Sequence, residues 1–428
     1  MKSNFLTKLT ALLLSCASFV CCALACGGDT VEGDSSVSVS SEKTSVEESV
    51  VPSSSIDKEE SSSNSSEDIP ATDEKEESSV PTDSEEESSV PTNSEEEEDG
   101  VILVGTEGLH YELTEKKDGY IVDWAMADIP AEVVVPSLYN GLPVVGIGNG
   151  VFCYYYSHLT SITIGKGITF IGEMAFRNCC NLTNLVIPEG VVSIGKEAFM
   201  NCSKLKSISL PDSLTSLGES AFYECAELES VTIPEGVTEI GKNTFLNCWK
   251  LTTVNLPAAL CSIGDNAFER CFKLTGLTIP QKVTSIGKEA FCSCGSLTEI
   301  TIPSGVTEIL QYTFQMCGSL QRITLGDNVK SIGRNAFYNC EELVSVQFGG
   351  SLTNIGYEAF RSCGKLTSIS LPASLQTIEW GAFQSCESLK HVSYAGLVEA
   401  WGKVTLQGQW KASTQITKIT CADGAVNV

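Results

Sequence analysis

The sequence is poor in histidine, with three residues, His110, His158 and His391, scattered along 428 positions. A catalytic set of nucleophile, base and acid would have to draw its base from these three. No nucleophile turn or phosphate-binding glycine loop surrounds them. The sequence also has no Cys-x-x-Cys pair and no His-containing cluster, so no set of metal ligands converges. We therefore expect no enzymatic activity, no metal site and no cofactor.

Basic residues are scarce as well, since 27 Lys and Arg stand against 54 Asp and Glu and the formal net charge is −27. Beyond residue 99 the imbalance is smaller, with 30 acidic and 22 basic residues. A protein that binds the phosphate backbone of nucleic acid carries the opposite charge. Nucleic acid is therefore not an expected partner.

Long apolar runs are missing except near the N-terminus, where two lysines precede the apolar stretch Leu9–Val20. This stretch is too short to favour a spanning helix, and small residues before Cys26 are typical of a secretion signal. The segment is similar to a bacterial lipoprotein signal, which implies that residues 1–25 are removed and that diacylglycerol is joined to the Cys26 thiol. The alternatives are an ordinary secretory cleavage site nearby and lipidation at Cys16 or Cys22.

A second unusual segment follows at residues 26–100. Between residues 29 and 99 there are 24 Asp and Glu against 3 Lys, and the rest is mostly Ser, Thr, Val and Pro. Such a segment cannot bury enough apolar surface to offset its chain entropy, so we predict a disordered tether. The tether would lift a folded region above a membrane, and an acidic partner-binding tail is the alternative.

Beyond residue 100 the sequence repeats with a fixed period. Phenylalanine recurs every 23 residues from Phe176 to Phe383, with Phe152 preceding by 24, and cysteine keeps the same step from Cys179 to Cys386. A period in this range signals a solenoid, because each unit is too small to close its own core and must stack on its neighbours.

One repeat unit shows what each part of a coil should do. Leu205, Ile208 and Leu210 alternate with serines, which predicts a short strand with its leucine and isoleucine side chains inward, and stacked units would form a parallel sheet. Pro211 ends the strand because it lacks an N–H donor. Gly218 is expected to turn the chain.

The last part of the unit, Ala221-Phe222 followed by Cys225, is predicted to form a short helical turn that plugs the coil. The whole unit resembles the BspA-like subgroup of leucine-rich repeats, whose form is Leu-x-x-Ile-x-Ile-Pro-x-x-Val-x-x-Ile-Gly-x-x-Ala-Phe-x-x-Cys. The resemblance covers about residues 120–395. It departs from the family at Leu310, where glycine is expected, and at Gly326 and Gly349, where proline is expected.

This resemblance implies a leucine-rich-repeat solenoid of 23-residue units with a parallel β-sheet, short helical turns and terminal caps. The N-terminal cap and first repeats are expected at residues 101–158, the solenoid at 159–391 and the C-terminal cap at 392–428. The flanks are also similar to the family, and Trp401 and Trp410 are expected in the C-terminal cap.

Fifteen cysteines follow Cys26, which in an exported protein would normally suggest disulfides. Ten of them occupy the same place in successive units, so they share one inward environment and have no partner within their own unit. We interpret these ten as buried thiols that pack as small apolar side chains. Disulfides remain the alternative, and Cys153 with Cys180 is the pair that could join adjacent coils.

The candidate partner-binding residues are large side chains at positions where other units carry small ones. Trp249-Lys250 and Phe272-Lys273 follow the repeated cysteine in adjacent coils, where other units have Ser, Ala, Gly or Glu. Two rings on a coil edge, flanked by ammonium groups, could anchor a partner. Edge packing between coils is the alternative. A second patch is predicted at Tyr154, Tyr155 and Tyr156.

Resemblance to the BspA-like family implies a protein on the bacterial cell surface that binds extracellular matrix or neighbouring-cell proteins. The sequence therefore predicts an exported, lipid-anchored protein-binding scaffold, with an extracellular or cell-surface protein as its partner. The lipid is its expected link to the membrane. A self-assembling surface-structural protein is the alternative, and a hydrolase is a third hypothesis.

Overall fold

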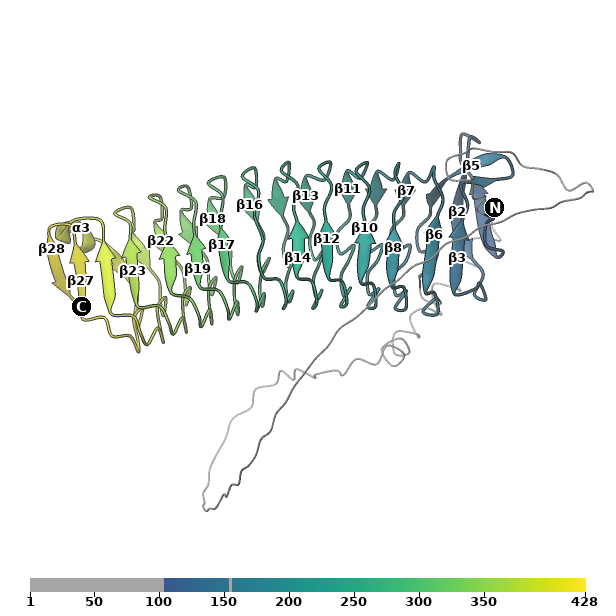
Figure 1. Cartoon of the computed structure of the whole chain (residues 1–428). Helices are drawn as coiled ribbons and strands as arrows, with labels where there is room; N and C mark the ends of the chain where they lie inside the picture. Colours follow the sequence, from purple (N-terminus) through teal and green to yellow (C-terminus); the bar gives the residue numbers. More distant parts are fainter. Residues whose placement is uncertain (1–103, 154–155) are drawn as a thin grey trace, which may run out of the picture. The chain divides into compact units, whose positions relative to one another are not determined.

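The computed structural model describes residues 104–153 and 156–428, and these form a stack of parallel coils (Figure 1). The predicted signal peptide, Cys26 and the acidic tether lie outside the described residues. The stack makes about 13 turns with a repeat of about 23 residues, which confirms the predicted solenoid. Within the described residues, no helix has the length and apolar character needed to cross a membrane.

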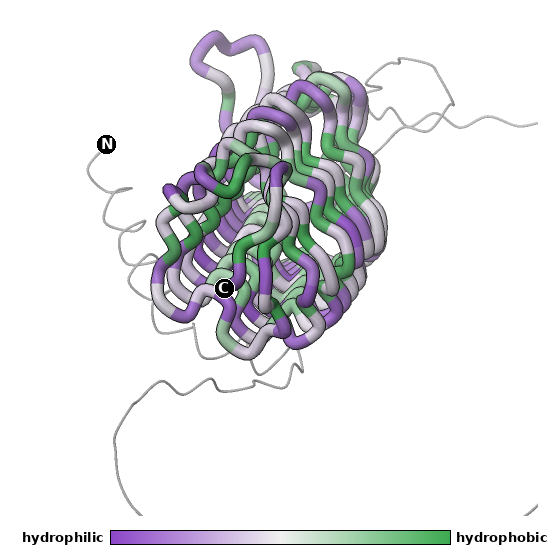
Figure 2. The backbone as a smooth tube through the Cα atoms, turned by 90° about the vertical axis from the view of Figure 1, so that its left-hand side faces the viewer, coloured by the Kyte–Doolittle hydropathy of each residue, from purple (hydrophilic) through white to green (hydrophobic). Residues whose placement is uncertain are grey.

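Each coil begins with a strand on what we call the front face. In the coil that starts at Leu205, strand β10 (Ser207–Ser209) buries Ile208 and exposes both serines, as the alternation predicts. Strand β10 pairs in parallel with β8 (Asn184–Val186), with partners 23 residues apart such as Ser207 and Asn184. Because the repeat length equals this offset, residues of one kind line up from coil to coil (Figure 2).

The front-face strands do not form one continuous sheet. They fall into the groups β3-β6, β8-β10-β12-β14, β17-β19-β21 and β23-β25-β27-β28. The remaining bounds are β3 (Glu132–Val135), β6 (Ser161–Ile164), β12 (Ser230–Thr232), β14 (Thr253–Asn255), β17 (Glu299–Thr301), β19 (Arg322–Thr324), β21 (Ser345–Gln347), β23 (Ser368–Leu371) and β25 (His391–Tyr394).

A second ladder of parallel strands, which the sequence reasoning missed, lies beyond the proline turn. In the same coil it is β11 (Ser216–Leu217), which buries Leu217 and pairs with the strand 23 residues earlier. Its members are β7 (Phe170–Ile171), β9 (Ser193–Ile194), β13 (Glu239–Ile240), β15 (Ser262–Ile263), β16 (Ser285–Ile286), β18 (Glu308–Ile309), β20 (Ser331–Ile332), β22 (Asn354–Ile355) and β24 (Thr377–Ile378).

The third side of each coil, which we call the turn side, corrects the predicted helical turn at Ala221-Phe222. Ser220 and Glu224 have left-handed backbones, with φ of 56° and 60°, which a right-handed helix cannot contain. Phe222 N donates to Thr244 O of the next coil at 3.0 Å, whereas Tyr223 N donates back to Ser220 O at 3.1 Å. Successive backbone N–H groups thus donate hydrogen bonds alternately to the next coil and to a carbonyl within the same turn.

Phenylalanine rings fill the inside of the turn side in one continuous stack. From Phe152 to Phe383, each ring stacks on the next with centroids 5.0 to 5.5 Å apart. Tyr156 at one end and Trp410 at the other meet the terminal rings edge-on. Edge-on contact is a favoured aromatic geometry, and here it closes both ends of the stack.

The ten repeated cysteines are buried and free, which confirms the interpretation as thiols. Each Sγ donates to the carbonyl oxygen of the phenylalanine 26 or 27 residues earlier, as Cys225 does to Phe199 O at 3.2 Å. Burial raises the pKa of the Cys225 thiol well above its usual range. Cys153 is a free thiol, so the disulfide considered between it and Cys180 does not form.

The repeated glycine has a different role from the one expected. Gly218 is not left-handed, but a Cβ on it would lie 2.4 Å from Gly195 C and Lys196 N in the preceding coil. The glycine is therefore required by the close approach of stacked backbones rather than by the turn itself. At Gly326, where proline is expected, Val329 N still donates to the residue 326 carbonyl at 3.2 Å, so the turn is kept.

Antiparallel strands lie at both ends of the coils. At the N-terminal end β1 (Leu109–Leu113) pairs with β2 (Tyr120–Ala125), and β4 (Leu138–Tyr139) pairs with β5 (Leu142–Ile147). At the C-terminal end β27 (Lys418–Cys421) pairs with β28 (Gly424–Asn427), beside helix α3 (Val398–Trp401). Strand β26 (Thr405–Leu406) pairs with β24 and ends the second ladder. Trp401 and Trp410 are buried there.

Candidate binding surface

The aromatic pair Trp249 and Phe272 lies on the surface of two adjacent coils. Their exposed fractions are 50% and 43%, in a fold whose other repeat aromatics are mostly buried. At the same place in the neighbouring coils stand Ala226 and Gly295, so no large side chain flanks the pair along the stack. Both rings are therefore accessible to a partner, and their binding role remains a prediction.

The lysines beside the two rings differ in their surroundings. Lys250 Nζ lies 2.6 Å from Glu227 Oε2, so this ammonium group is paired with a carboxylate of the preceding coil. Lys273 is exposed next to Phe272. The exposed ion pair contributes little to stability, since such pairs are worth about 0–1 kcal/mol.

The tyrosine patch is placed differently from the prediction. Tyr156 is 4% exposed, its hydroxyl donates to Ala125 O at 2.5 Å, and burial raises its pKa to about 12. Tyr156 closes the phenylalanine stack, so it is not part of the candidate binding surface. Tyr154 and Tyr155 lie outside the described residues.

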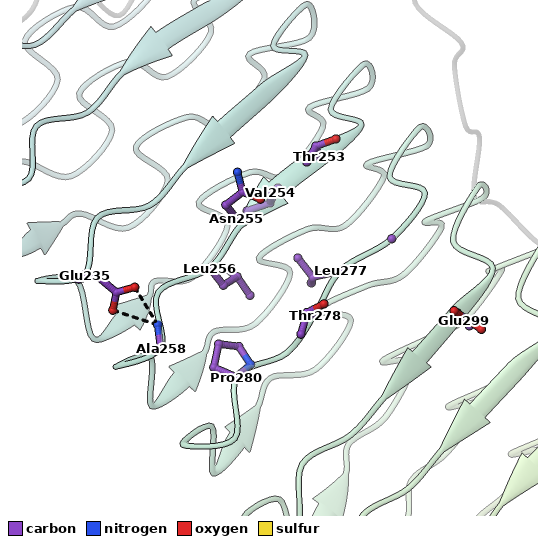
Figure 3. A pocket seen from close by; sticks show the side chains of 11 residues that line it. Glu235, Thr253, Val254, Asn255, Leu256, Ala258, Leu277, Thr278, Pro280 and Glu299 are labelled. Carbon is purple, nitrogen blue, oxygen red and sulfur yellow. Dashed lines mark hydrogen bonds between the residues drawn. The ribbon is translucent and has the colours of Figure 1, made fainter.

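A hollow, which sequence reasoning did not predict, opens on the front face between β14 and β17 (Figure 3). The intervening segment 276–278 occupies a strand position but forms no strand, and its pairing is a single bridge between Thr253 and Gly276. The hollow has a volume of about 590 Å³. Ligand sites in proteins commonly have volumes of about 300–1,000 Å³, so a short segment of a partner could fit.

The walls of this hollow combine apolar and acidic groups. Leu256, Leu277 and Pro280 provide apolar surface, and Glu235 and Glu299 stand on either side (Figure 3). The Glu235 carboxylate accepts the backbone N–H of residue 258 at 3.0 and 3.3 Å, which holds it in place. The residues around the hollow include no Lys or Arg.

The model of the BspA type leucine rich repeat region matches residues 146–275 and 261–390, in six copies. The chain belongs to this family. The resemblance drawn from the repeated Leu, Ile, Pro, Gly, Ala-Phe and Cys positions is thereby confirmed, and so is membership of a class of leucine-rich-repeat surface proteins.

Solved structures similar to this BspA-type chain come from several bacteria. A leucine rich cell surface protein from Faecalibacterium prausnitzii is 29% identical, covering 72% of this chain and 98% of its own, with a TM-score of 0.49. The T. pallidum leucine-rich-repeat protein is 33% identical over 44% of this chain and 87% of its own, with a TM-score of 0.42. A Bacteroides ovatus leucine-rich-repeat protein is 25% identical, covering 76% and 91%, with a TM-score of 0.44. No curated protein matches the chain.

The three histidines of this BspA-type chain have separate surroundings. His110 Nδ1 lies 2.5 Å from Asp123 Oδ1, and His158 Nε2 lies 2.8 Å from Ile129 O. His391 belongs to β25, in the last repeats. Among the hydrogen bonds of the described residues, none links a Ser, Thr or Cys side chain to any of the three rings. The hydrolase hypothesis therefore gains no support from these contacts.

Proposed function

We propose that the chain is a cell-surface protein-binding scaffold that adheres to host or neighbouring-cell proteins through its repeat face. The observation that carries this proposal is the exposed pair Trp249 and Phe272 on adjacent coils. Large aromatic side chains are enriched at the energetic centres of protein interfaces. A rigid stack of coils presents them without a loss of backbone entropy on binding.

We also propose that the protein is held at the membrane through a lipid on Cys26. The small residues before this cysteine and the acidic Ser- and Glu-rich segment that follows it support an anchored, extended attachment. Mass spectrometry of the membrane-extracted protein is the test. A diacylglycerol-modified Cys26 at the mature N-terminus is expected, and an unmodified N-terminus elsewhere contradicts the anchor.

Binding is tested with the full chain against immobilised extracellular matrix and cell-surface proteins. Replacing both rings, Trp249→Ala with Phe272→Ala, should weaken binding at least about tenfold, since each interface aromatic contributes on the order of 1–2 kcal/mol. The matched control is Trp124→Ala, because Trp124 is 45% exposed but lies in β2, far along the chain from the pair.

The same experiment separates the alternative function. If the full chain associates with itself in a concentration-dependent manner and binds none of the partner proteins, the self-assembling structural role replaces adhesion. Equal binding by the double variant and the parent chain would remove the aromatic pair from the proposed site.

A further inference from the structure

Gly276 lines the hollow on the front face. Gly276 lies in the outward column of the front strands, and it has no side chain there. A Cβ added to Gly276 would meet nothing within 4 Å, and its φ is not left-handed, so neither crowding nor backbone conformation requires a glycine. The other residues of this column are Ser161, Asn184, Ser207, Ser230, Thr253, Glu299, Arg322, Ser345, Ser368 and His391.

The turn side is continuous at the hollow, whereas the second ladder is interrupted between β16 and β18. Phe245, Phe268 and Phe291 stack at 5.4 and 5.5 Å in the same coils, and β13, β15 and β16 remain paired on the second ladder. The front-face sheets are also separate between β6 and β8 and between β21 and β23, but at those places each of the two adjacent coils has its own front strand. The segment 276–278 is the place where a whole front strand is lacking between β14 and β17.

The interruption leaves the segment 277–278 without a strand partner. Neither β14 nor β17 pairs with Leu277 or Thr278. An extended peptide can lie across this part of the front face, with alternate side chains entering the hollow. The small side chains Thr253 and Asn255 on the flanking strand leave room for this approach.

The charge around the hollow selects a basic segment. Glu235 is exposed while its carboxylate accepts the N–H of residue 258. Glu299 is exposed as well, and its nearest cation is Arg322 Nε at 3.8 Å. With two carboxylates and no Lys or Arg at the walls, arginine or lysine side chains are complementary. An acidic segment such as residues 29–99 has the wrong charge for this hollow.

The aromatic pair lies on the same two coils. Trp249 precedes Thr253 by four residues, and Phe272 precedes Gly276 by four. Four residues span at most about 14 Å, so five or six residues of an extended segment reach from the hollow to the rings. Arginine side chains also bind favourably over aromatic rings.

We propose that the hollow at Gly276, together with Trp249 and Phe272, binds an extended, basic peptide segment of a partner protein. This inference rests on the proposed binding function and assigns its partner chemistry. The segment lies over 276–278 and places basic side chains at Glu235 and Glu299.

The test uses the full chain and a fluorescein-labelled octapeptide in which arginine alternates with threonine and valine. Fluorescence anisotropy should detect saturable binding of this peptide, and the same peptide with glutamate in place of arginine should bind at least tenfold more weakly. Gly276→Leu fills the hollow and should lower the affinity at least tenfold.

The matched control is Gly364→Leu. A Cβ at Gly364 also meets nothing within 4 Å, and this glycine lies several coils away from the hollow. It should leave the affinity within twofold, and both leucine variants should melt at the temperature of the parent chain. The double variant Glu235→Gln with Glu299→Gln should bind the arginine peptide more weakly than the parent chain does. Its affinity for the glutamate peptide should not decrease.

Three results would overturn the inference. The first is equal affinity for the arginine and glutamate peptides, and the second is undiminished binding of the arginine peptide by Gly276→Leu. The third is that the arginine peptide does not bind, whereas an oligosaccharide such as chitotriose binds and loses its binding in Gly276→Leu. If partner proteins bind but the arginine peptide does not, this inference alone fails. If partner proteins fail to bind as well, the proposed function fails with it.

Discussion

The turn side and the front face of the coils are built by the same 23-residue repeat but differ in continuity. On the turn side, Phe152 to Phe383 stack without a gap, and every repeated thiol donates to a phenylalanine carbonyl of an earlier coil. On the front face, the strands fall into separate sheets and one coil has no strand at 276–278. A continuous core on one side therefore allows the other side to vary, and variation there leaves space for a partner.

The largest expected effect compares two phenylalanines of one coil. Phe268 is fully buried in the stack, whereas Phe272 is 43% exposed. Phe268→Ala should lower the free energy of unfolding by about 3–5 kcal/mol, because it leaves a cavity between Phe245 and Phe291. Phe272→Ala should change it by about 0.5 kcal/mol or less.

Guanidinium unfolding followed by circular dichroism measures both phenylalanine variants. If Phe268→Ala and Phe272→Ala lowered the free energy of unfolding by similar amounts, the proposed difference in packing between the inside of the turn side and the coil surface would be contradicted. The same would follow from a negligible loss for Phe268→Ala alone.

A smaller effect compares two glycines. A Cβ on Gly218 would lie 2.4 Å from the backbone of the preceding coil, whereas a Cβ on Gly276 meets nothing within 4 Å. Gly218→Ala should therefore cost about 1–3 kcal/mol, as overpacking does, and Gly276→Ala should be within about 0.5 kcal/mol of the parent. Thermal melts decide this comparison. A destabilised Gly276→Ala would show that the front face is as tightly packed as the stacked turns.

Much of the fold could be predicted because the repeat length sets the register. The 23-residue step places each Phe and Cys on its counterpart, and the alternation at Ile208 predicts the front strand. The helical turn at Ala221-Phe222 was wrong because local sequence does not show that Phe222 N bonds to the next coil. The second ladder was missed because two residues, Ser216–Leu217, are too few to show an alternation.

The candidate surface was predictable in part. Trp249 and Phe272 stand where other coils have small residues, and the structure exposes them. Tyr156 gave no such signal, because its burial depends on a hydrogen bond to Ala125, 31 residues earlier, and on the position of Phe152 in the stack. The hollow was missed because one glycine in a column, Gly276, does not show that its coil has lost strand pairing.

Hydrogen–deuterium exchange of the full chain tests most directly the claim that one side is continuous while the other is interrupted. Backbone amides that lack ladder hydrogen bonds exchange through small local openings, whereas paired amides need larger ones. We predict that peptides containing residues 276–278 exchange at least about tenfold faster than those containing β12 (Ser230–Thr232), while those containing Phe268 stay protected. Equal protection of 276–278 and β12 would contradict the account.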